Sequence, residues 1–269
     1  AELHRMDHLL GSIAPGKYAD LLLVGSLSQF NVEKVVAGGR VVAQDGEMLA
    51  PLPSPEYPAY FYDTFHLPQK VEPDDLLLKV DGEARQAKVL VLFVPPYSPV
   101  RIGSEAVLPV IDGRIQPDPD NDILYCAIVE RHKGTGNIGL GLVRGFGLNG
   151  GTMASTIGSP TCNIMCIGSN PEDMALAINY VAEVGGGQVV VKGGQIVEEV
   201  RLPMGGFMAD VPAKEMAEQE RAITEVLHGW GCPIERPWIY FMFFEIVPLP
   251  EYAMTEHGVV EFKTLQYVD

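Results

Sequence analysis

Residues 170–191, NPEDMALAINYVAEVGGGQVVV, contain the clearest signals for secondary structure in the sequence. Asn170 can cap a helix, Pro171 suits a first helical turn, and the acids at 172 and 173 suit the positive end of the helix dipole. We therefore predict a helix that begins after Asn170 and runs to Val184. Three glycines at 185–187 end this helix, and the β-branched run at 189–191 predicts a buried strand.

The sequence around this stretch is rich in strand patterns. Apolar runs that predict strands lie before the helix at 88–94, 122–130 and 162–167. After it we expect a hairpin turn at Gly193-Gly194, a second helix from near Pro212 to about His228, and a buried strand over the aromatic run Trp238–Val247. Because strands come first and the two helices come late, the predicted class is α+β.

The first 50 residues predict short strands joined by tight turns. Gly38-Gly39 separates strand-like runs at 32–37 and 40–42, and Asp45-Gly46 is a second turn signal. Prolines then cluster between 51 and 75, which is typical of a linker. We predict a small β-domain over 1–60, a linker over 61–85 and a larger domain over 86–269. The chain opens in what reads as the middle of a helix, so we expect it to be a fragment.

Composition excludes several classes of function. The net charge of −16 repels phosphate backbones and anionic lipids, so we expect no nucleic-acid or membrane binding. No apolar stretch approaches the roughly 18–20 residues of a membrane span. Four sparse cysteines in apolar surroundings indicate reduced thiols rather than a disulfide framework, which predicts a cytoplasmic protein.

Two motifs match known sites only in part. Gly134, Gly136 and Gly139 fit the dinucleotide fingerprint, but further glycines follow where a helix is needed, so we predict tight turns and close backbone contacts instead. His4 and His8 have helical metal-ligand spacing without a carboxylate between them. Cys162 and Cys166 stand one residue too far apart for a zinc deaminase motif. We therefore predict no metal site in this chain.

Residues 10–24, LGSIAPGKYADLLLV, resemble the segment that follows the catalytic barrel in many amidohydrolases. There a Pro-Gly turn leads the chain into a strand of a small β-domain. Residues 35–42, followed by Asp45-Gly46, resemble the closing hairpin of the same domain. The resemblance implies the amidohydrolase superfamily and says nothing of the substrate.

The remaining blocks resemble the C-terminal domain of bacterial adenine deaminases. They are residues 130–136, 141–148, 170–177, 185–191 and 202–210. The resemblance implies an α+β domain of an enzyme that hydrolyses adenine to hypoxanthine and ammonia. It also implies iron or manganese on a (β/α)₈ barrel that is missing from this chain, with adenine as the substrate and a homo-oligomeric assembly.

One loop departs from the family pattern. Adenine deaminases usually have His-Asp-Ser-His-Asn where this chain has Ser159-Pro160-Thr161-Cys162-Asn163. Imidazoles and a carboxylate move protons near neutral pH, and Ser, Pro and Cys do so less well. The departure leaves the substrate open, as well as whether loop 158–163 reaches an active site.

Candidate ligand-contacting residues flank this loop and the glycine-rich stretch. They are Glu130, Arg131, His132, Thr161 and Asn163, of which Glu130 and His132 have groups that can orient a purine edge. A local hydrogen-bonded turn is an equal interpretation. Two other functions stay open for the whole chain: a non-catalytic binding or assembly module, and part of an amidohydrolase acting on another cyclic amidine or amide.

Overall fold

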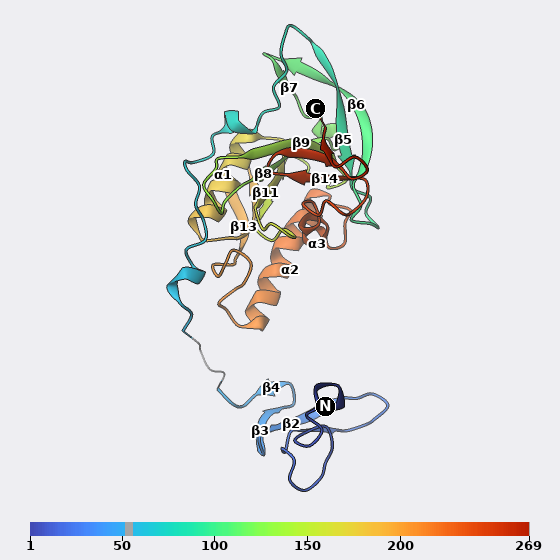
Figure 1. Ribbon diagram of the computed structural model, residues 1–269, viewed down its shortest axis with the longest axis vertical. Coiled ribbons are helices and arrows are strands. Elements are labelled where there is room, and N and C mark those ends of the chain that lie inside the picture. Colours follow the sequence, from blue (N-terminus) through green and yellow to red (C-terminus); the bar gives the residue numbers. More distant parts are fainter. Residues whose placement is uncertain (52–55, 269) are drawn as a thin grey trace. The chain divides into compact units, whose positions relative to one another are not determined.

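The computed structural model describes residues 1–51 and 56–268 and divides into two compact units, 1–57 and 58–269 (Figure 1). The predicted domain boundaries remain a prediction, and residues 52–55 of the predicted first domain lie outside the described residues. Residues 61–85, for which we predicted a linker, belong to the second unit. Val71 and Leu76 are buried there. The Val71 N–H donates to the side-chain oxygen of Asn179 at 2.9 Å, and Asn179 Nδ2 donates to the Val71 carbonyl oxygen at 2.8 Å.

The first unit is a four-stranded antiparallel sheet in the order β1-β2-β3-β4. Its elements are the 3-10 turn η1 (Glu2–His4), β1 (Leu21–Val24), β2 (Val32–Ala37), β3 (Arg40–Gln44) and β4 (Glu47–Met48). Gly38 and Gly39, both at positive φ, form the predicted hairpin turn, as this turn type requires. The opening helix that we expected is only the three-residue η1. None of the described residues of this unit is buried.

The second unit is built on a nine-stranded sheet in the order β13-β12-β10-β11-β8-β9-β5-β6-β7. Its strands are β5 (Gln86–Phe93), β6 (Ile102–Ile111), β7 (Arg114–Ile115), β8 (Leu124–Val129), β9 (Ile138–Arg144), β10 (Thr152–Ser155), β11 (Ile164–Gly168), β12 (Gly187–Lys192) and β13 (Gln195–Arg201). Among the described strand pairs of this sheet, only β5–β9 is parallel. Short 3-10 turns are η2 (Ala59–Phe61), η3 (Pro73–Leu76) and η4 (Pro119–Asn121).

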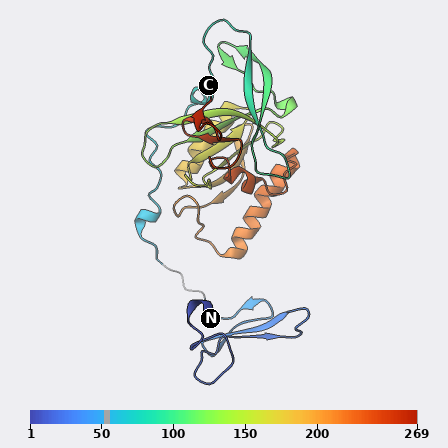
Figure 2. The same cartoon turned by 45° about the vertical axis from the view of Figure 1, so that its right-hand side comes forward.

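Both faces of this sheet are covered. Along β12, Val189 and Val191 belong to one apolar cluster and Val190 to the other, because successive side chains of a strand point to opposite faces. Helix α1 (Pro171–Glu183) packs with the first cluster, and α2 (Ala213–Trp230) and α3 (Pro237–Met242) pack with the second (Figure 2). The sheet therefore lies at the centre of the unit.

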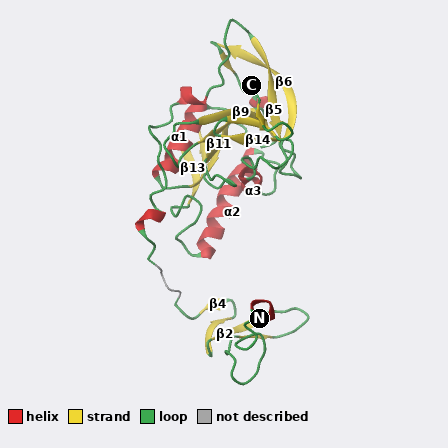
Figure 3. Cartoon of the chain, viewed as in Figure 1, coloured by secondary structure: helices red, strands yellow, loops and turns green. Residues whose placement is uncertain are grey.

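The class and both predicted helices are confirmed. Strands dominate and helices are few, as expected for an α+β chain (Figure 3). The Asn170 side chain accepts a hydrogen bond from the Asp173 N–H at 2.8 Å, which is the predicted cap. No helix in the described part of the chain combines the length and apolar character of a membrane span.

The strand predicted over Trp238–Val247 is wrong. Residues 237–242 form α3, with Pro237 in its first turn, and strand β14 (Tyr252–Thr255) follows further along the chain. A continuous apolar run does not distinguish a buried strand from a buried helix, and proline favours the first turn of a helix. Phe241 and Phe244, three residues apart, both pack against Phe146.

A third sheet explains part of the glycine-rich stretch. Strands β14 (Tyr252–Thr255), β15 (Gly258–Glu261) and β16 (Gln266–Tyr267) form it, and its β14–β15 hairpin packs on β9. A Cβ on Gly139 would lie 1.9 Å from the Thr255 carbonyl oxygen, so only glycine allows this approach. The prediction of close backbone contacts is confirmed, since β9 is a strand where the dinucleotide motif requires a helix.

All four cysteines are free thiols. Cys126, Cys166 and Cys232 are buried, as predicted. Cys162 is only half-buried, because it lies in the loop before β11 rather than in that strand.

Candidate functional site

The five predicted site residues come together because of one strand pair. Strands β8 and β11 are antiparallel, and Val129 at the end of β8 pairs with Ile164 at the start of β11. Residues 130–132 therefore leave the sheet beside the incoming loop 158–163. Hydrogen bonds from both Arg131 and His132 cross to this loop.

Glu130 closes its own turn. Its carboxylate accepts hydrogen bonds from the backbone N–H groups of His132, Lys133 and Thr135, at 2.5, 2.8 and 3.1 Å, and from the Thr135 hydroxyl at 3.0 Å. Burial alone would raise the pKa of Glu130, but these donors outweigh it and lower the pKa to about 2. The geometry is that of the local hydrogen-bonded turn that we set against ligand binding.

Arg131 is a buried clamp, with 1% of its surface exposed. Its Nε donates to the Cys162 carbonyl oxygen at 2.5 Å and its Nη2 to that of Gly205 at 2.8 Å. Its Nη1 donates to the backbone and side-chain oxygens of Thr64, and the guanidinium stacks on Phe65. Burial lowers the pKa of Arg131. The residue joins three segments that are distant in sequence.

His132 is exposed and holds the same loop from outside. Its Nε2 lies 2.7 Å from the Thr161 carbonyl oxygen. A carbonyl oxygen only accepts hydrogen bonds, so Nε2 must carry the proton.

A further partner of the loop, Glu245, is absent from the predicted set of five residues. It follows α3 and is 2% exposed. Its Oε1 accepts hydrogen bonds from the Thr161 hydroxyl and from Asn163 Nδ2, the latter at 3.1 Å. Its Oε2 is buried and has no hydrogen-bond partner among the described residues. The sequence held one signal, since Glu245 is the only acid in the apolar run 238–247.

The electrostatics of Glu245 oppose those of Glu130. Burial raises the pKa of Glu245, and the nearby charge of Glu256 adds to the increase. Hydrogen bonds from Thr161 and Asn163 act in the other direction without reversing it. A buried carboxyl of this kind holds a proton to higher pH than a free one.

Asn163 lies between two acids. Its Nδ2 donates to Glu245 Oε1 and, at 3.4 Å, to Glu256 Oε2. Its Oδ1 is buried and, within the described chain, has no partner. The cluster of Thr161, Asn163, Glu245 and Glu256, which we call the Glu245 cluster, thus contains two unpaired buried oxygen atoms.

Arg101 fixes the position of the Glu245 backbone. Its guanidinium is fully buried and donates to the carbonyl oxygens of Phe243 and Ile246, at 2.8 and 2.9 Å, on either side of Glu245. A third bond, 2.7 Å long, goes to the carbonyl oxygen of Tyr252. Burial lowers the pKa of Arg101 to about 10, so it stays charged at neutral pH. Two buried arginines therefore support the cluster, Arg131 at loop 158–163 and Arg101 at the Glu245 backbone.

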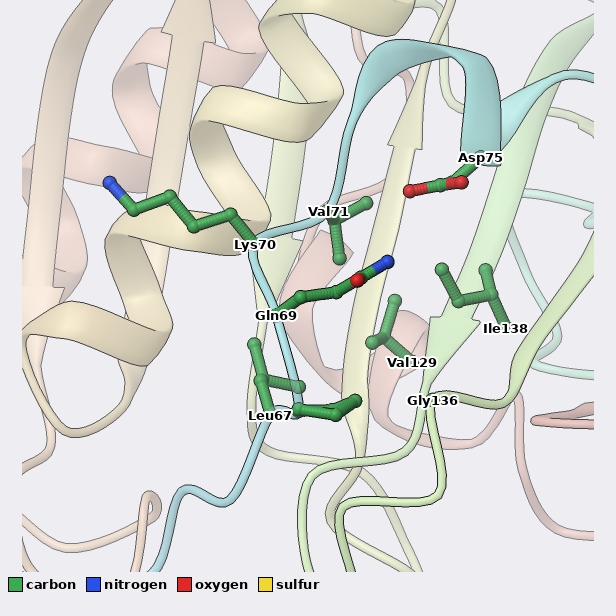
Figure 4. Close-up of a pocket in the computed structure, with 9 residues that line it drawn as sticks. Leu67, Gln69, Lys70, Val71, Asp75, Val129, Gly136 and Ile138 are labelled. Carbon is green, nitrogen blue, oxygen red and sulfur yellow. The ribbon is translucent and has the colours of Figure 1, made fainter.

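The pocket beside the Glu130 turn is small. Its volume is about 90 Å³, and Val129, Gly136 and Ile138 line it opposite the segment from Leu67 to Val71 (Figure 4). The Gln69 amide points into the pocket and Lys70 points away (Figure 4). Ligand pockets commonly measure roughly 300–1,000 Å³, so we assign no ligand to this one.

The described side chains do not form a divalent metal site. Among residues 1–51 and 56–268, no three His, Cys, Asp or Glu side chains are grouped so that they could hold a metal ion. The catalytic iron and manganese sites implied by the resemblance need several such ligands. No chemical step is therefore assigned to a metal in this chain.

Two family models match the sequence. The adenine deaminase C-terminal domain matches residues 101–266, and the amidohydrolase family matches residues 1–42. Similar proteins include adenine deaminase 4 of Rhizobium meliloti, 39% identical over 269 residues. Adenine deaminases of Moorella thermoacetica and Clostridium botulinum are 35% and 34% identical. Each alignment covers all of this chain and 45% of the relative, so the chain spans less than half the length of these relatives.

Proposed function

Because the chain belongs to the adenine deaminase family through its C-terminal domain, we propose that it is the C-terminal part of an enzyme that hydrolyses adenine to hypoxanthine and ammonia. The observation that carries this proposal is the alignment of the whole chain with proteins named adenine deaminase. The proposed activity belongs to the whole protein, since the chain covers 45% of the relatives' length.

The proposed metal lies outside this chain. The family indicates a divalent metal in the parent enzyme, and we propose iron or manganese on a (β/α)₈ barrel formed by the missing part. When bound there, the metal would supply the activated hydroxide that attacks the purine carbon bearing the amine. The match of residues 1–42 to the amidohydrolase family, together with the 45% coverage of the relatives, supports this division of labour.

The first unit supports a composite β-domain. Its sheet exposes apolar side chains such as Leu22, Val41 and Met48, of which Leu22 is 53% exposed. A sheet normally buries one apolar face against another layer. We propose that this unit belongs to a small β-domain completed by the missing part, as the match of residues 1–42 to the amidohydrolase family supports.

The experiment that tests the proposal compares two purified proteins, the full-length protein that contains this sequence and the 269-residue chain. Each is loaded with manganese or iron and assayed for ammonia release from adenine. We expect turnover only from the full-length protein. Ammonia release by the 269-residue chain with stoichiometric metal would overturn the proposed division of labour, and failure of the full-length protein would overturn the proposed activity.

A second candidate substrate class follows from the loop that departs from the family pattern. Ser159-Pro160-Thr161-Cys162 replaces the residues usual at this position, which favours a related cyclic amidine or amide as the alternative substrate. Profiling the full-length protein with adenine, other aminopurines and cyclic amides decides between them.

The four free cysteines support a proposed cytoplasmic location. A homo-oligomer stays a prediction.

A further inference from the structure

Loop 158–163 has no histidine or acid of its own, yet the fold brings a carboxyl group to it. We propose that Glu245 is the proton reservoir of this loop, and that the Thr161 hydroxyl passes the proton to a basic nitrogen of a purine-class ligand. This inference rests on the proposed function and deepens it. Thr161 would contact the ligand, and Glu245 would act through Thr161.

The geometry separates a buried end from an exposed end. Glu245 is 2% exposed, whereas Thr161, hydrogen-bonded to it, lies at the surface. Asn163 donates to the same Glu245 oxygen and, through its backbone N–H, to the Thr161 hydroxyl oxygen at 3.3 Å. The hydroxyl is thus the group through which a surface ligand reaches the buried carboxyl.

The proton transfer balances without a further reactant. When Glu245 is protonated, its O–H donates to the Thr161 oxygen, and the Thr161 proton is free to point outward. As Thr161 gives this proton to the ligand nitrogen, it takes the proton of Glu245. One N–H bond and one Thr161 O–H bond form, the old Thr161 O–H bond and the Glu245 O–H bond break, and a carboxylate and a protonated ligand remain.

The surroundings of Glu245 favour a reservoir over a fixed ion pair. Within the described chain, no Lys, Arg or His nitrogen lies within 4.0 Å of its carboxylate. The titratable and charged groups that act on it are Glu256 from the β14–β15 turn, Cys126 from β8 and Arg131 from the neighbouring turn. Cys126 is a buried thiol whose pKa is raised by burial, and the Arg131 donors already bind Cys162, Thr64 and Gly205.

The unpaired oxygen gives an independent indication. Glu245 Oε2 is buried close to Gly158 and Met165. A Cβ added to Gly158 would lie 2.3 Å from this oxygen and 3.0 Å from Met165 Cε. A carboxylate with one oxygen in such surroundings is costly when ionised, and a neutral carboxyl relieves that cost. Carboxyls whose pKa is raised by burial are found at many functional sites.

The test uses the full-length protein with four substitutions. In E245Q the side chain keeps its shape and loses its exchangeable acid proton, and in T161V the relay hydroxyl is removed while Glu245 stays. We expect kcat on adenine to fall about 100-fold in each, with KM changed less than threefold. T161S restores the hydroxyl and should recover most of the activity. E235Q, the same chemical change at an exposed acid in the α2–α3 connection, is the matched control.

The pH profile and a direct titration separate a relay from a structural role. The wild-type kcat profile should show a limb that disappears in E245Q and remains in E235Q. Carbon-13 NMR of glutamate-labelled 269-residue chain should show the Glu245 carboxyl titrating above the ordinary value of 4.5. Titration at or below that value overturns the inference.

The activity outcomes distinguish the two proposals. A wild-type protein that turns over adenine, together with E245Q and T161V variants of equal activity, overturns this inference alone. A wild-type protein that does not turn over adenine overturns the proposed function, and this inference with it. Loss of activity in T161V with recovery in T161S supports the relay even if E245Q fails to fold.

Discussion

The turn at 130–135 and the loop at 158–163 each enclose a buried glutamate, and the two acids behave in opposite ways. Glu130 is 6% exposed and accepts four hydrogen bonds, three of them from backbone N–H groups. Glu245 is 2% exposed and accepts two, both on one oxygen. The pKa falls to about 2 in the first and rises in the second.

Burial alone therefore does not decide whether an acid is charged. Hydrogen-bond donors also decide it, because each N–H directed at a carboxylate stabilises the ionised form. An acid that is fully hydrogen-bonded in this way serves the local fold. An acid with an unpaired buried oxygen is less well stabilised when ionised, which is why the proposed proton transfer uses Glu245, whereas the hydrogen bonds of Glu130 indicate a structural role.

The largest expected effect concerns the residue that joins both regions. Arg131→Ala leaves the carbonyl oxygens of Cys162, Thr64 and Gly205 without their donor. We expect the free energy of unfolding to fall by about 3–5 kcal/mol. Urea unfolding followed by tryptophan fluorescence measures it, since both tryptophans, Trp230 and Trp238, lie in the second unit.

Arg201→Ala is the matched control for this clamp. The Arg201 side chain is 59% exposed, so its loss should change the free energy of unfolding by less than about 0.5 kcal/mol. A loss below about 1 kcal/mol for Arg131→Ala would mean that the turn and the loop are held together by other contacts.

The next prediction concerns Glu130, whose carboxylate accepts four hydrogen bonds. Glu130→Gln removes a charged acceptor of backbone N–H groups, and we expect a loss of about 2 kcal/mol at pH 7. The folded pKa of about 2 lies below the ordinary 4.5, so the ionised acid stabilises the fold above pH 4.5. This contribution is lost as pH falls from 4.5 through 2. Urea unfolding of both proteins at pH 7 and at the lowest pH at which they fold should show the difference shrinking.

Substitution of Glu245, whose carboxyl has one unpaired oxygen, should change stability with pH in the opposite direction. The pKa of folded Glu245 is raised, so ionisation costs stability at high pH and the cost disappears below the ordinary value of 4.5. Glu245→Gln should therefore leave the protein as stable or more stable at pH 8, by on the order of 1 kcal/mol, and lose this advantage in acid. The stability of the variant relative to wild type should be higher at pH 8 than at pH 5. A lower relative stability at pH 8 would contradict a raised pKa for Glu245.

Much of this comparison was within reach of the sequence. The capped helix after Asn170, the hairpins and the free thiols followed from local rules, because caps, turns and apolar runs act over a few residues. Glu130 and Thr161 were singled out as site candidates, and the pairing of β8 with β11 places them in adjacent loops. Strand pairing is a long-range property, and the sequence showed the two strands without showing that they are neighbours.

Glu245 was out of reach for a related reason. Its segment read as a strand, in which an acid would point to one face of a sheet, whereas it follows α3 in a turn held by Arg101. Three of the four carbonyl oxygens that Arg101 binds are 142 to 151 residues away along the chain. Hydrogen bonds from a side chain to distant backbone leave no periodic signal, so the partner of loop 158–163 appears only in the fold.

The smallest expected effect separates support of the loop from proton transfer. His132→Ala removes one hydrogen bond at the surface, to the Thr161 carbonyl oxygen, and should cost about 0.5 kcal/mol in urea unfolding. A loss above about 1.5 kcal/mol would show that this surface contact is a main support of the loop. A loss near about 0.5 kcal/mol, with kcat unchanged, would leave proton transfer with Glu245, because the two residues approach Thr161 from opposite ends, one at its carbonyl and the other at its hydroxyl.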